Sequence, residues 1–245
     1  MSRRRLFAPA IWCAVPLMFS SSVFAQGKRE AAPPDVPQDH RPGLYFREDF
    51  KGPPAGVHIT PITQDYITNA NLELKLYGAG KALQIDHSDL PKDDPNFVWT
   101  GLAESNWGLA LRDRTNYIDL TGLAKIRWRT EQTGFHQLRP MIKIADGTWL
   151  VGEYAEGWTP DWHEGEFWPA WIRWRKLNID KVSEAPTGTH YQNGIWEDHP
   201  DLSKVDEIGF TDLMAGSGRG EGGWCRIDWI EVYGNPVKRD TGSTK

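Results

Sequence analysis

The chain is poor in cysteine and has no long apolar run beyond its first residues. Of its 245 residues only Cys13 and Cys225 are cysteines. Cys13 lies in an N-terminal segment that we expect to be removed, so one thiol remains and no intramolecular disulfide is expected. No later run approaches the roughly 20 apolar residues that a membrane-spanning helix needs. The sequence therefore predicts no integral membrane span, and the core alone must stabilise the fold.

Several catalytic motifs and an excess of positive charge are also missing. There is no Gly-x-Ser-x-Gly elbow, phosphate-binding loop, dinucleotide fingerprint or His-Glu-x-x-His zinc motif. Without the arginines at positions 3–5 the chain keeps 25 basic and 33 acidic residues, a formal charge of −8. Nucleic acids and anionic membranes select basic surfaces, so neither is an expected partner.

The N-terminus has the features of a secretory signal. Three arginines precede an apolar stretch from Leu6 to Phe19, and small residues follow before Ala25. This pattern predicts a signal peptide over residues 1–25, cleaved after Ala25, and hence a periplasmic or secreted protein. Residues 26–43 contain four prolines and almost no apolar side chains, which predicts a disordered leader.

The segment 44–236 reads as one all-β domain, followed by a flexible tail over 237–245. Short apolar runs recur along it, each bounded by Gly, Pro, Asn or Asp, as in sandwiches and barrels. Residues 126–129 alternate apolar with charged, which is typical of an antiparallel strand with one wet face. Asp146 and Gly147 predict a tight hairpin turn. No stretch keeps a helical apolar period, so we predict a single jelly-roll antiparallel β-sandwich with little helix.

Three segments carry a resemblance to a known family. They are residues 117–123 (YIDLTGL), residues 201–210 (DLSKVDEIGF) and residues 226–233 (RIDWIEVY). In this order they resemble the galactose-binding-like jelly rolls found in many carbohydrate-binding modules, where the last segment is a closing strand that pairs beside the first strand. The resemblance implies the fold more strongly than any ligand.

The same resemblance implies a metal. Such modules often hold a structural calcium with acidic residues of the first and last strands. The matching positions here are Glu48, Asp49 and Asp228, and carboxylate oxygens are the ligands that calcium prefers. The alternative is that Asp228 pairs locally while Glu48 and Asp49 are solvated.

Tryptophan is unevenly distributed. From residue 26 onward the chain keeps 12 of its 13 tryptophans, and six lie within residues 149–174. Because side chains two apart share a face of a strand, Trp168, Trp171 and Trp174 cannot all point inward. We expect some of them to be exposed or to cover a loop. The tryptophans inside strand patterns are expected in the core: Trp128, Trp149, Trp224 and Trp229.

Residues 156–174 read as a long loop that enters a strand, and they predict a ligand site. Indole faces stack on sugar rings, while arginine and carboxylate groups hydrogen-bond the hydroxyls. The expected stacking residues are Trp158, Trp162 and Trp168, and the expected polar partners are Glu164, Glu166 and Arg173. Arg219, in a glycine-rich connection, is a further candidate for a ligand carboxylate. The alternative is that these indoles only plug one end of the sandwich.

The same segment offers the one arrangement suited to hydrolysis. Glu164 and Glu166 in extended backbone share a face roughly 6.5 to 7 Å apart, which overlaps the carboxyl separations of glycosidases, and His163 precedes them. The Glu-x-Asp-x-Glu strand of sandwich endoglucanases is absent, however. His136 precedes Arg139 and could face a cleft, although a lone histidine is more often satisfied locally.

Three functions remain in order of preference. The first is an exported domain that recognises a poly- or oligosaccharide through the aromatic loop. The second is a glycoside hydrolase or polysaccharide lyase on the same scaffold, using Glu164, Glu166 or His163. The third is a structural or protein-interaction domain whose aromatics are all core. A chain with its own signal and no separate catalytic domain is expected to act alone, with a partner protein, or as the enzyme itself.

Overall fold

The computed structural model describes residues 41–52, 59–87, 96–179, 196–213 and 223–239. The expected signal peptide, nearly all of the expected leader, Arg219 and residues 240–245 of the expected tail lie outside these ranges. Within them, no helix has both the length and the apolar character needed to cross a bilayer.

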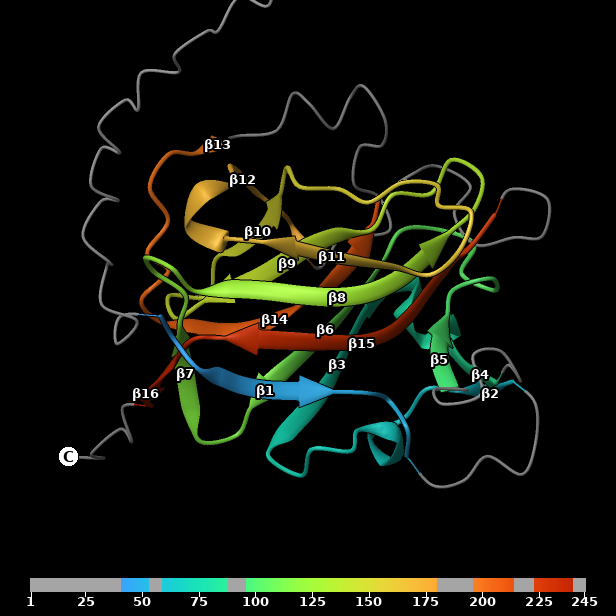
Figure 1. Cartoon of the computed structure of the whole chain (residues 1–245), viewed down its shortest axis with the longest axis horizontal. Coiled ribbons are helices and arrows are strands. Elements are labelled where there is room, and N and C mark those ends of the chain that lie inside the picture. The colour runs from blue at the N-terminus through green and yellow to red at the C-terminus, as the bar shows by residue number, and fades with distance from the viewer. Residues whose placement is uncertain (1–40, 53–58, 88–95, 180–195, 214–222, 240–245) are drawn as a thin grey trace, which may run out of the picture. The chain divides into compact units, whose positions relative to one another are not determined.

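The described residues form two antiparallel sheets (Figure 1). The first sheet contains, in order, β11 (His163–Phe167), β8 (Lys125–Gln132), β15 (Cys225–Tyr233), β5 (Asn96–Trp99), β4 (Gln84–His87) and β2 (Thr60–Pro61), with β1 (Leu44–Glu48) also paired to β15. The second contains β13 (Trp196–Glu197), β12 (Trp174–Lys176), β10 (Trp149–Gly152), β9 (Arg139–Ile144), β14 (Val205–Asp212), β6 (Trp107–Asp113) and β3 (Leu72–Gly78). Strand β7 (Asn116–Asp119) pairs with β14 and with β16 (Asn235–Lys238).

Helix is limited, in the part of the chain that the structure describes, to short 3₁₀ turns: η2 (Gln64–Tyr66), η3 (Ala79–Ala82) and η4 (Pro169–Trp171). The prediction of an all-β antiparallel sandwich is therefore confirmed. Strands β8, β15 and β1 cross the front of Figure 1, with β14, β6 and β3 of the second sheet behind them. The predicted hairpin is also present, because Gly147 has a φ of +93° between β9 and β10 and Thr148 N donates to Asp146 Oδ1 at 2.7 Å.

The core lies between the two sheets and is centred on aromatic side chains. Strand β8 alternates strictly, so that Ile126, Trp128 and Thr130 are buried while the arginines between them face outward. The Trp128 ring lies 5.1 Å from the ring of Phe167 and 5.2 Å from that of Phe210, which belongs to the second sheet. Trp128 thus packs across the interface that joins the sheets.

A bulge in β15 keeps its apolar residues facing this core. The pairing of β15 with β8 shifts between Ile227 and Trp229, which leaves Asp228 as the extra residue. Such a shift exchanges the faces of all later side chains, so Ile230 points inward like Ile227 while Trp229 points outward. The buried carboxylate of Asp228 accepts a hydrogen bond from Arg129 at 2.6 Å.

The tryptophans expected in the core occupy three different places. Trp128 is in the main core, as predicted. Trp149 is buried in a second apolar cluster with Ala110, Met141 and Val151 of the second sheet. Trp229 is buried on the outer face of the first sheet under the guanidinium groups of Arg47 and Arg127, and Trp224 is only half-buried.

Two segments differ from the predicted organisation. Residues 163–167, expected within a long loop, form the edge strand β11, which pairs with β8. The alternation of small and charged residues in this strand has no strong β propensity, so tertiary pairing decides its conformation. Strand β16 continues to Lys238, two residues past the expected domain boundary at 236, and Arg239 forms an ion pair with Asp206.

The free edge of the second sheet is partly covered by one side chain. Strand β3 is last in its sheet and pairs only with β6 among the described strands. The amide of Gln64, in η2, donates to Leu72 O at 3.0 Å and accepts from Leu74 N at 2.8 Å. The side chain therefore makes the two backbone hydrogen bonds that a further strand would make at this point.

Glu48, at the end of β1, organises the backbone around it. Its carboxylate is fully buried and accepts hydrogen bonds from the backbone N–H groups of Phe50 (2.8 Å), Thr68 (2.9 Å) and Asn69 (3.0 Å). Phe50 is itself fully buried with a φ of +53°, a conformation that is unusual for a bulky residue. The carboxylate thus holds a strained turn and ties it to residues 68–69.

We predict that Glu48→Ala lowers the free energy of unfolding by about 3 kcal/mol or more, because it leaves three N–H groups without their acceptor. Asp49→Ala removes only a part-exposed ion pair with Arg47 and should cost less than about 1 kcal/mol. Urea unfolding of both variants checks this difference. Equal effects of the two substitutions would contradict it. The same unfolding curves are recorded with calcium. If calcium raises the urea midpoint of the native protein but not that of Glu48→Ala, Glu48 also binds the metal.

Candidate functional site

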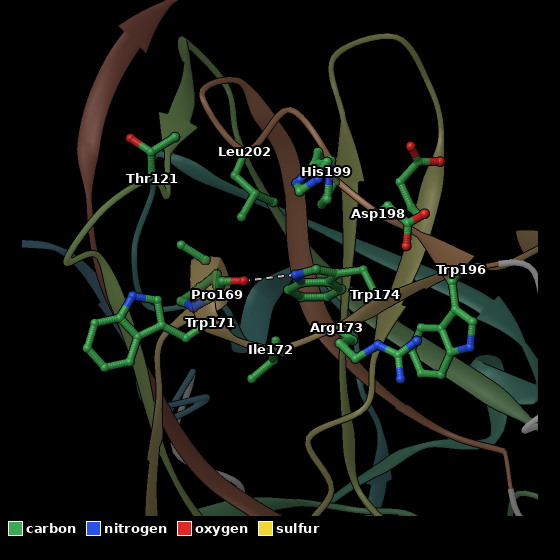
Figure 2. Close-up of a pocket in the computed structure, with 13 residues that line it drawn as sticks. Thr121, Pro169, Trp171, Ile172, Arg173, Trp174, Trp196, Asp198, His199 and Leu202 are labelled. Carbon is green, nitrogen blue, oxygen red and sulfur yellow. Dashed lines mark hydrogen bonds between the residues drawn. The ribbon is translucent and has the colours of Figure 1, made fainter.

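A pocket of about 570 Å³ opens where the turn η4, the start of β12 and the segment after β13 meet (Figure 2). It is lined by residues 169–174 and 196–200, together with Thr121 and Leu202. Its volume lies within the range of roughly 300 to 1,000 Å³ that is common for small-molecule sites. We call it the Trp171–Trp196 pocket, because Figure 2 shows these two indoles on opposite sides of it, with Trp174 between them.

The turn η4 decides which indoles are buried and which are exposed. Pro169 begins the turn, and its carbonyl accepts a hydrogen bond from Trp174 Nε1 at 2.9 Å. This bond holds the Trp174 ring in the core, where it is 1% exposed. Trp171 is left 68% exposed and stacks on Trp168, with ring centroids 5.4 Å apart and planes 26° apart. Trp168 therefore supports Trp171 from one side, and the predicted division of these tryptophans into buried and exposed is confirmed.

The other indole of the pocket is held by two arginines. Trp196 lies opposite Arg175 in the pairing of β12 with β13. The guanidinium carbons of Arg173 and Arg175 lie 3.7 Å and 4.0 Å from the centroid of the Trp196 ring. Contacts of this kind are attractive because the ring face is electron-rich. Arg173 is further positioned by its backbone N–H, which donates to Glu153 Oε1 at 3.0 Å.

Polar groups of both signs complete the lining. Glu197 forms an ion pair with Lys176 at 2.9 Å, and its hydrogen bond raises the pKa of that lysine. Asp198 and His199 are exposed beside it. The pocket therefore offers the exposed indole of Trp171, hydrogen-bond donors and hydrogen-bond acceptors without a dominant charge. Such a lining suits a neutral ligand that has both apolar faces and hydroxyl groups.

The structure separates the three tryptophans that the sequence predicts as stacking residues. Trp168 does not line the pocket but stacks on Trp171, and the predicted polar partner Arg173 lines the pocket. Trp158 is 64% exposed but lines a different, smaller hollow of about 230 Å³ together with His163.

Trp162 lies on yet another surface, the outer face of the first sheet. Its ring meets the edge of Phe97 at 5.6 Å, and the guanidinium of Arg129 lies over it at 5.0 Å. Arg219, the remaining predicted ligand residue, is outside the described residues. The predicted aromatic loop is therefore not one continuous binding surface.

Sequence reasoning missed Trp196, Asp198 and His199. They lie in a stretch that reads Trp-Glu-Asp-His, where an indole stands next to acidic and imidazole groups. This combination of an indole with polar groups is the one feature of the sequence that could have indicated a ligand site here. Its place opposite η4, however, depends on the pairing of β13 with β12, which no local pattern predicts.

The carboxylates considered for hydrolysis are paired with cations. Glu164 and Glu166 share the outward face of β11, as their spacing predicts. Glu164 forms an ion pair with Arg127 at 2.9 Å, and Glu166 with Lys125 at 2.8 Å. Both belong to a network that continues through Arg127 to Glu231 of β15. This arrangement supports sheet pairing, and no described pocket has either glutamate in its lining.

The residues considered for calcium are likewise bound to protein donors. Glu48 accepts three backbone N–H groups, Asp49 forms an ion pair with Arg47, and Asp228 forms one with Arg129. Calcium needs six to eight oxygen ligands gathered around one point. The described residues do not bring these three carboxylates into one cluster of that kind. Calcium binding at Glu48, Asp49 and Asp228 stays a prediction.

Comparisons with known proteins give likenesses of structure only. No model of a protein family matches the sequence, and a search of curated proteins finds no match. Among solved structures, the family 11 carbohydrate-binding module of the cellulosomal cellulase Lic26A-Cel5E of Clostridium thermocellum is similar at 13% identity and a TM-score of 0.40, over 81% of this chain and 97% of that one. A family 30 carbohydrate-binding module is similar at 11% identity and a TM-score of 0.38, over 78% of this chain and 99% of the module. An exo-β-agarase is similar at 15% identity and a TM-score of 0.39, over 76% of this chain and 26% of the agarase. At such values no ligand or binding residue is transferable from these structures to this chain.

We predict that the double variant Glu164→Gln, Glu166→Gln lowers the free energy of unfolding by less than about 1 kcal/mol, because both ion pairs are exposed to solvent and screened. Urea unfolding at low and high salt measures the change, which should shrink as salt rises. Asp161→Asn, a neighbouring exposed acidic residue, is the matched control. If the native protein releases reducing ends from a polysaccharide and the double variant does not, the two glutamates have a catalytic role that this arrangement does not account for.

Proposed function

We propose that the protein is an exported carbohydrate-binding domain that holds an oligosaccharide or a polysaccharide end in the Trp171–Trp196 pocket. The observation that carries the proposal is the exposed Trp171. The indole is 68% exposed, which leaves a large apolar surface in water, and it stacks on Trp168 in the lining of a pocket.

The chemistry of the lining supports a sugar over other small ligands. The C–H faces of a pyranose stack on indoles, and its hydroxyl groups both donate and accept hydrogen bonds. Trp171 supplies an exposed ring face, Arg173 donates, and Glu197 or Asp198 accepts. Trp196 positions Arg173, because its ring is covered by the guanidinium groups of Arg173 and Arg175. An anionic ligand would meet these two carboxylates, and a purely apolar ligand would leave the charged groups without partners.

Export is the second part of the proposal. Its support is the sequence of residues 1–25, with arginines before an apolar stretch and Ala25 at the expected cleavage position. A protein that reaches the periplasm or the medium can meet polysaccharides outside the cell, so the proposed ligand and location agree.

We predict that Trp171→Ala and Trp196→Ala each weaken binding to the recognised glycan about tenfold or more, which corresponds to about 1.4 kcal/mol. Trp171→Ala removes the stacking face, and Trp196→Ala removes the ring that positions Arg173. Affinity electrophoresis against a panel of plant, algal and bacterial polysaccharides identifies the glycan, and calorimetry measures its dissociation constant. Trp158→Ala is the matched control, because it removes an equally exposed indole that lies outside the pocket.

Two outcomes would contradict this assignment. Equal loss of affinity in Trp158→Ala would show that the pocket is not the site. Retained binding in both pocket variants would remove the pocket from the proposal as well. The same samples are assayed for new reducing ends, and their release by the native protein would favour the hydrolase or lyase alternative.

We also predict that the protein made with its full N-terminus is processed between Ala25 and Gln26. Expressed in a Gram-negative host, the periplasmic fraction should contain a form that begins at Gln26, as judged by intact mass and N-terminal sequencing. Ala25→Asp should block processing, because the cleavage position accepts small neutral side chains. A full-length protein found only in the cytoplasm would overturn the export part of the proposal.

A further inference from the structure

Three side chains that bind metals in proteins converge at the end of the sandwich where β8 and β14 finish and β15 begins. His136 follows β8, Asp212 is the last residue of β14, and Cys225 is the first residue of β15. Their ligand atoms all lie within 4.8 Å of one another, and His136 Nδ1 and Asp212 Oδ2 are 2.6 Å apart. The three residues are between 0% and 3% exposed.

A fourth polar group beside this cluster has no partner. Gln132 lies directly opposite Cys225 in the pairing of β8 with β15, so both side chains leave the same face of the sheet toward the core. Gln132 is 0% exposed, and among the described residues neither Nε2 nor Oε1 of its side chain has a hydrogen-bond partner. Buried amides are nearly always bonded, so an unpaired one next to a ligand cluster indicates that something else occupies the space.

We propose that His136, Asp212 and Cys225 bind one divalent transition-metal ion, of which zinc is the best match, with the oxygen of Gln132 or a water in the fourth position. Thiolate, imidazole and carboxylate together are a ligand set of intermediate softness, which suits zinc better than calcium or magnesium. Zinc bonds of about 2.0 to 2.3 Å place tetrahedral ligand atoms roughly 3.3 to 3.8 Å apart. The observed separations therefore need only small side-chain movements.

The binding step balances in charge and protons. The ion displaces the proton of the Cys225 thiol, which leaves to solvent, and a sulfur–metal bond replaces the S–H bond. The hydrogen bond between His136 and Asp212 opens, so that both groups bind the ion, and the neutral imidazole keeps its one proton on the ring nitrogen that does not face the metal. No electron is transferred, and one proton is released for each ion bound.

The cluster suits a structural ion better than a catalytic thiol. Cys225, His136 and Asp212 could be arranged as a nucleophile, a base and its orienting carboxylate. Cys225 is fully buried, however, whereas a nucleophilic cysteine needs access to its substrate. A metal ion removes the thiol proton without any need for substrate access.

The backbone around the histidine has little freedom. Gly223 has a φ of +106°, and a Cβ there would lie 2.4 Å from Thr133 O and 2.8 Å from His136 Cδ2. Only glycine therefore allows this close approach, which fixes the imidazole ring in place. A preformed ring position is what a specific metal site requires.

The test uses the full chain with Cys13→Ser, so that Cys225 is its one thiol, after removal of metals with a chelator. We expect one Co²⁺ per chain, with a thiolate-to-cobalt absorption band in the near ultraviolet and the visible bands of tetrahedral cobalt, both lost on addition of Zn²⁺. Zn²⁺ at a hundredfold excess over its dissociation constant should raise Tm by about 5 to 10 °C.

The variants separate the cluster from other sites. Cys225→Ala and His136→Gln should abolish the band, whereas His163→Ala, which removes an exposed histidine of β11, should keep it. Gln132→Leu should raise the Tm of the metal-free protein, because it removes an unpaired amide, and should weaken metal binding if the amide is the fourth ligand.

Either of two results would overturn the proposal: no band and no Zn²⁺-dependent rise of Tm in the native cluster, or a band that survives in His136→Gln. If Cys225→Ala does not fold, the Cys13→Ser chain alone still tests the proposal. Its one thiol is Cys225, so a thiolate-to-cobalt band can come only from that residue. The metal test is independent of carbohydrate binding, because none of the four residues lines the Trp171–Trp196 pocket.

Discussion

The pairing of β15 with β8 is the interaction on which the first sheet depends. Strand β15 lies between β8 on one side and β1 and β5 on the other, so the first sheet has no continuous centre without it. Its bulge at Asp228 is what allows one strand to present Ile227 and Ile230 to the same core. Arg129 of β8 holds the bulged carboxylate, so the neighbouring strand itself fixes the irregularity.

Both proposed sites lie where strands end and the chain turns. The Trp171–Trp196 pocket is built by a 3₁₀ turn, η4, and the residues after the short strand β13, and the proposed metal cluster joins the ends of β8 and β14 to the start of β15. The strands themselves provide rigidity, because their inner faces are packed with aromatic and branched side chains and their outer faces with ion pairs. In many proteins the strands form a rigid scaffold, and the functional groups lie on the loops and turns at their ends.

The sequence predicts the sheets better than the sites, for a physical reason. Strand β8 can be predicted from the sequence because its apolar and polar residues alternate strictly. The turn at Gly147 can be predicted because a positive φ favours glycine. Strand β11 cannot be predicted in the same way, since its Glu-Gly-Glu pattern becomes extended only by pairing with β8. The aromatic loop predicts that tryptophans such as Trp171 are exposed, but it does not predict Trp196, because the two meet only through the pairing of β12 with β13. His136 and Asp212 are 76 positions apart, so local sequence says nothing of their contact.

The side chain of Gln64 has a consequence for how these molecules behave at high concentration. An unpaired strand edge is a template for another chain, and extension of a sheet across molecules is how β-rich proteins aggregate. Strand β3 is seven residues long, against two for β13 at the other end of the same sheet, but its backbone at Leu72 and Leu74 is already engaged by the Gln64 amide. A second molecule cannot add a strand there without first displacing that side chain. On the first sheet, the edge strand β11 is only five residues long, and its Glu164 and Glu166 are charged side chains engaged in ion pairs with β8. Each of these two described edges thus carries a feature that opposes pairing with another molecule.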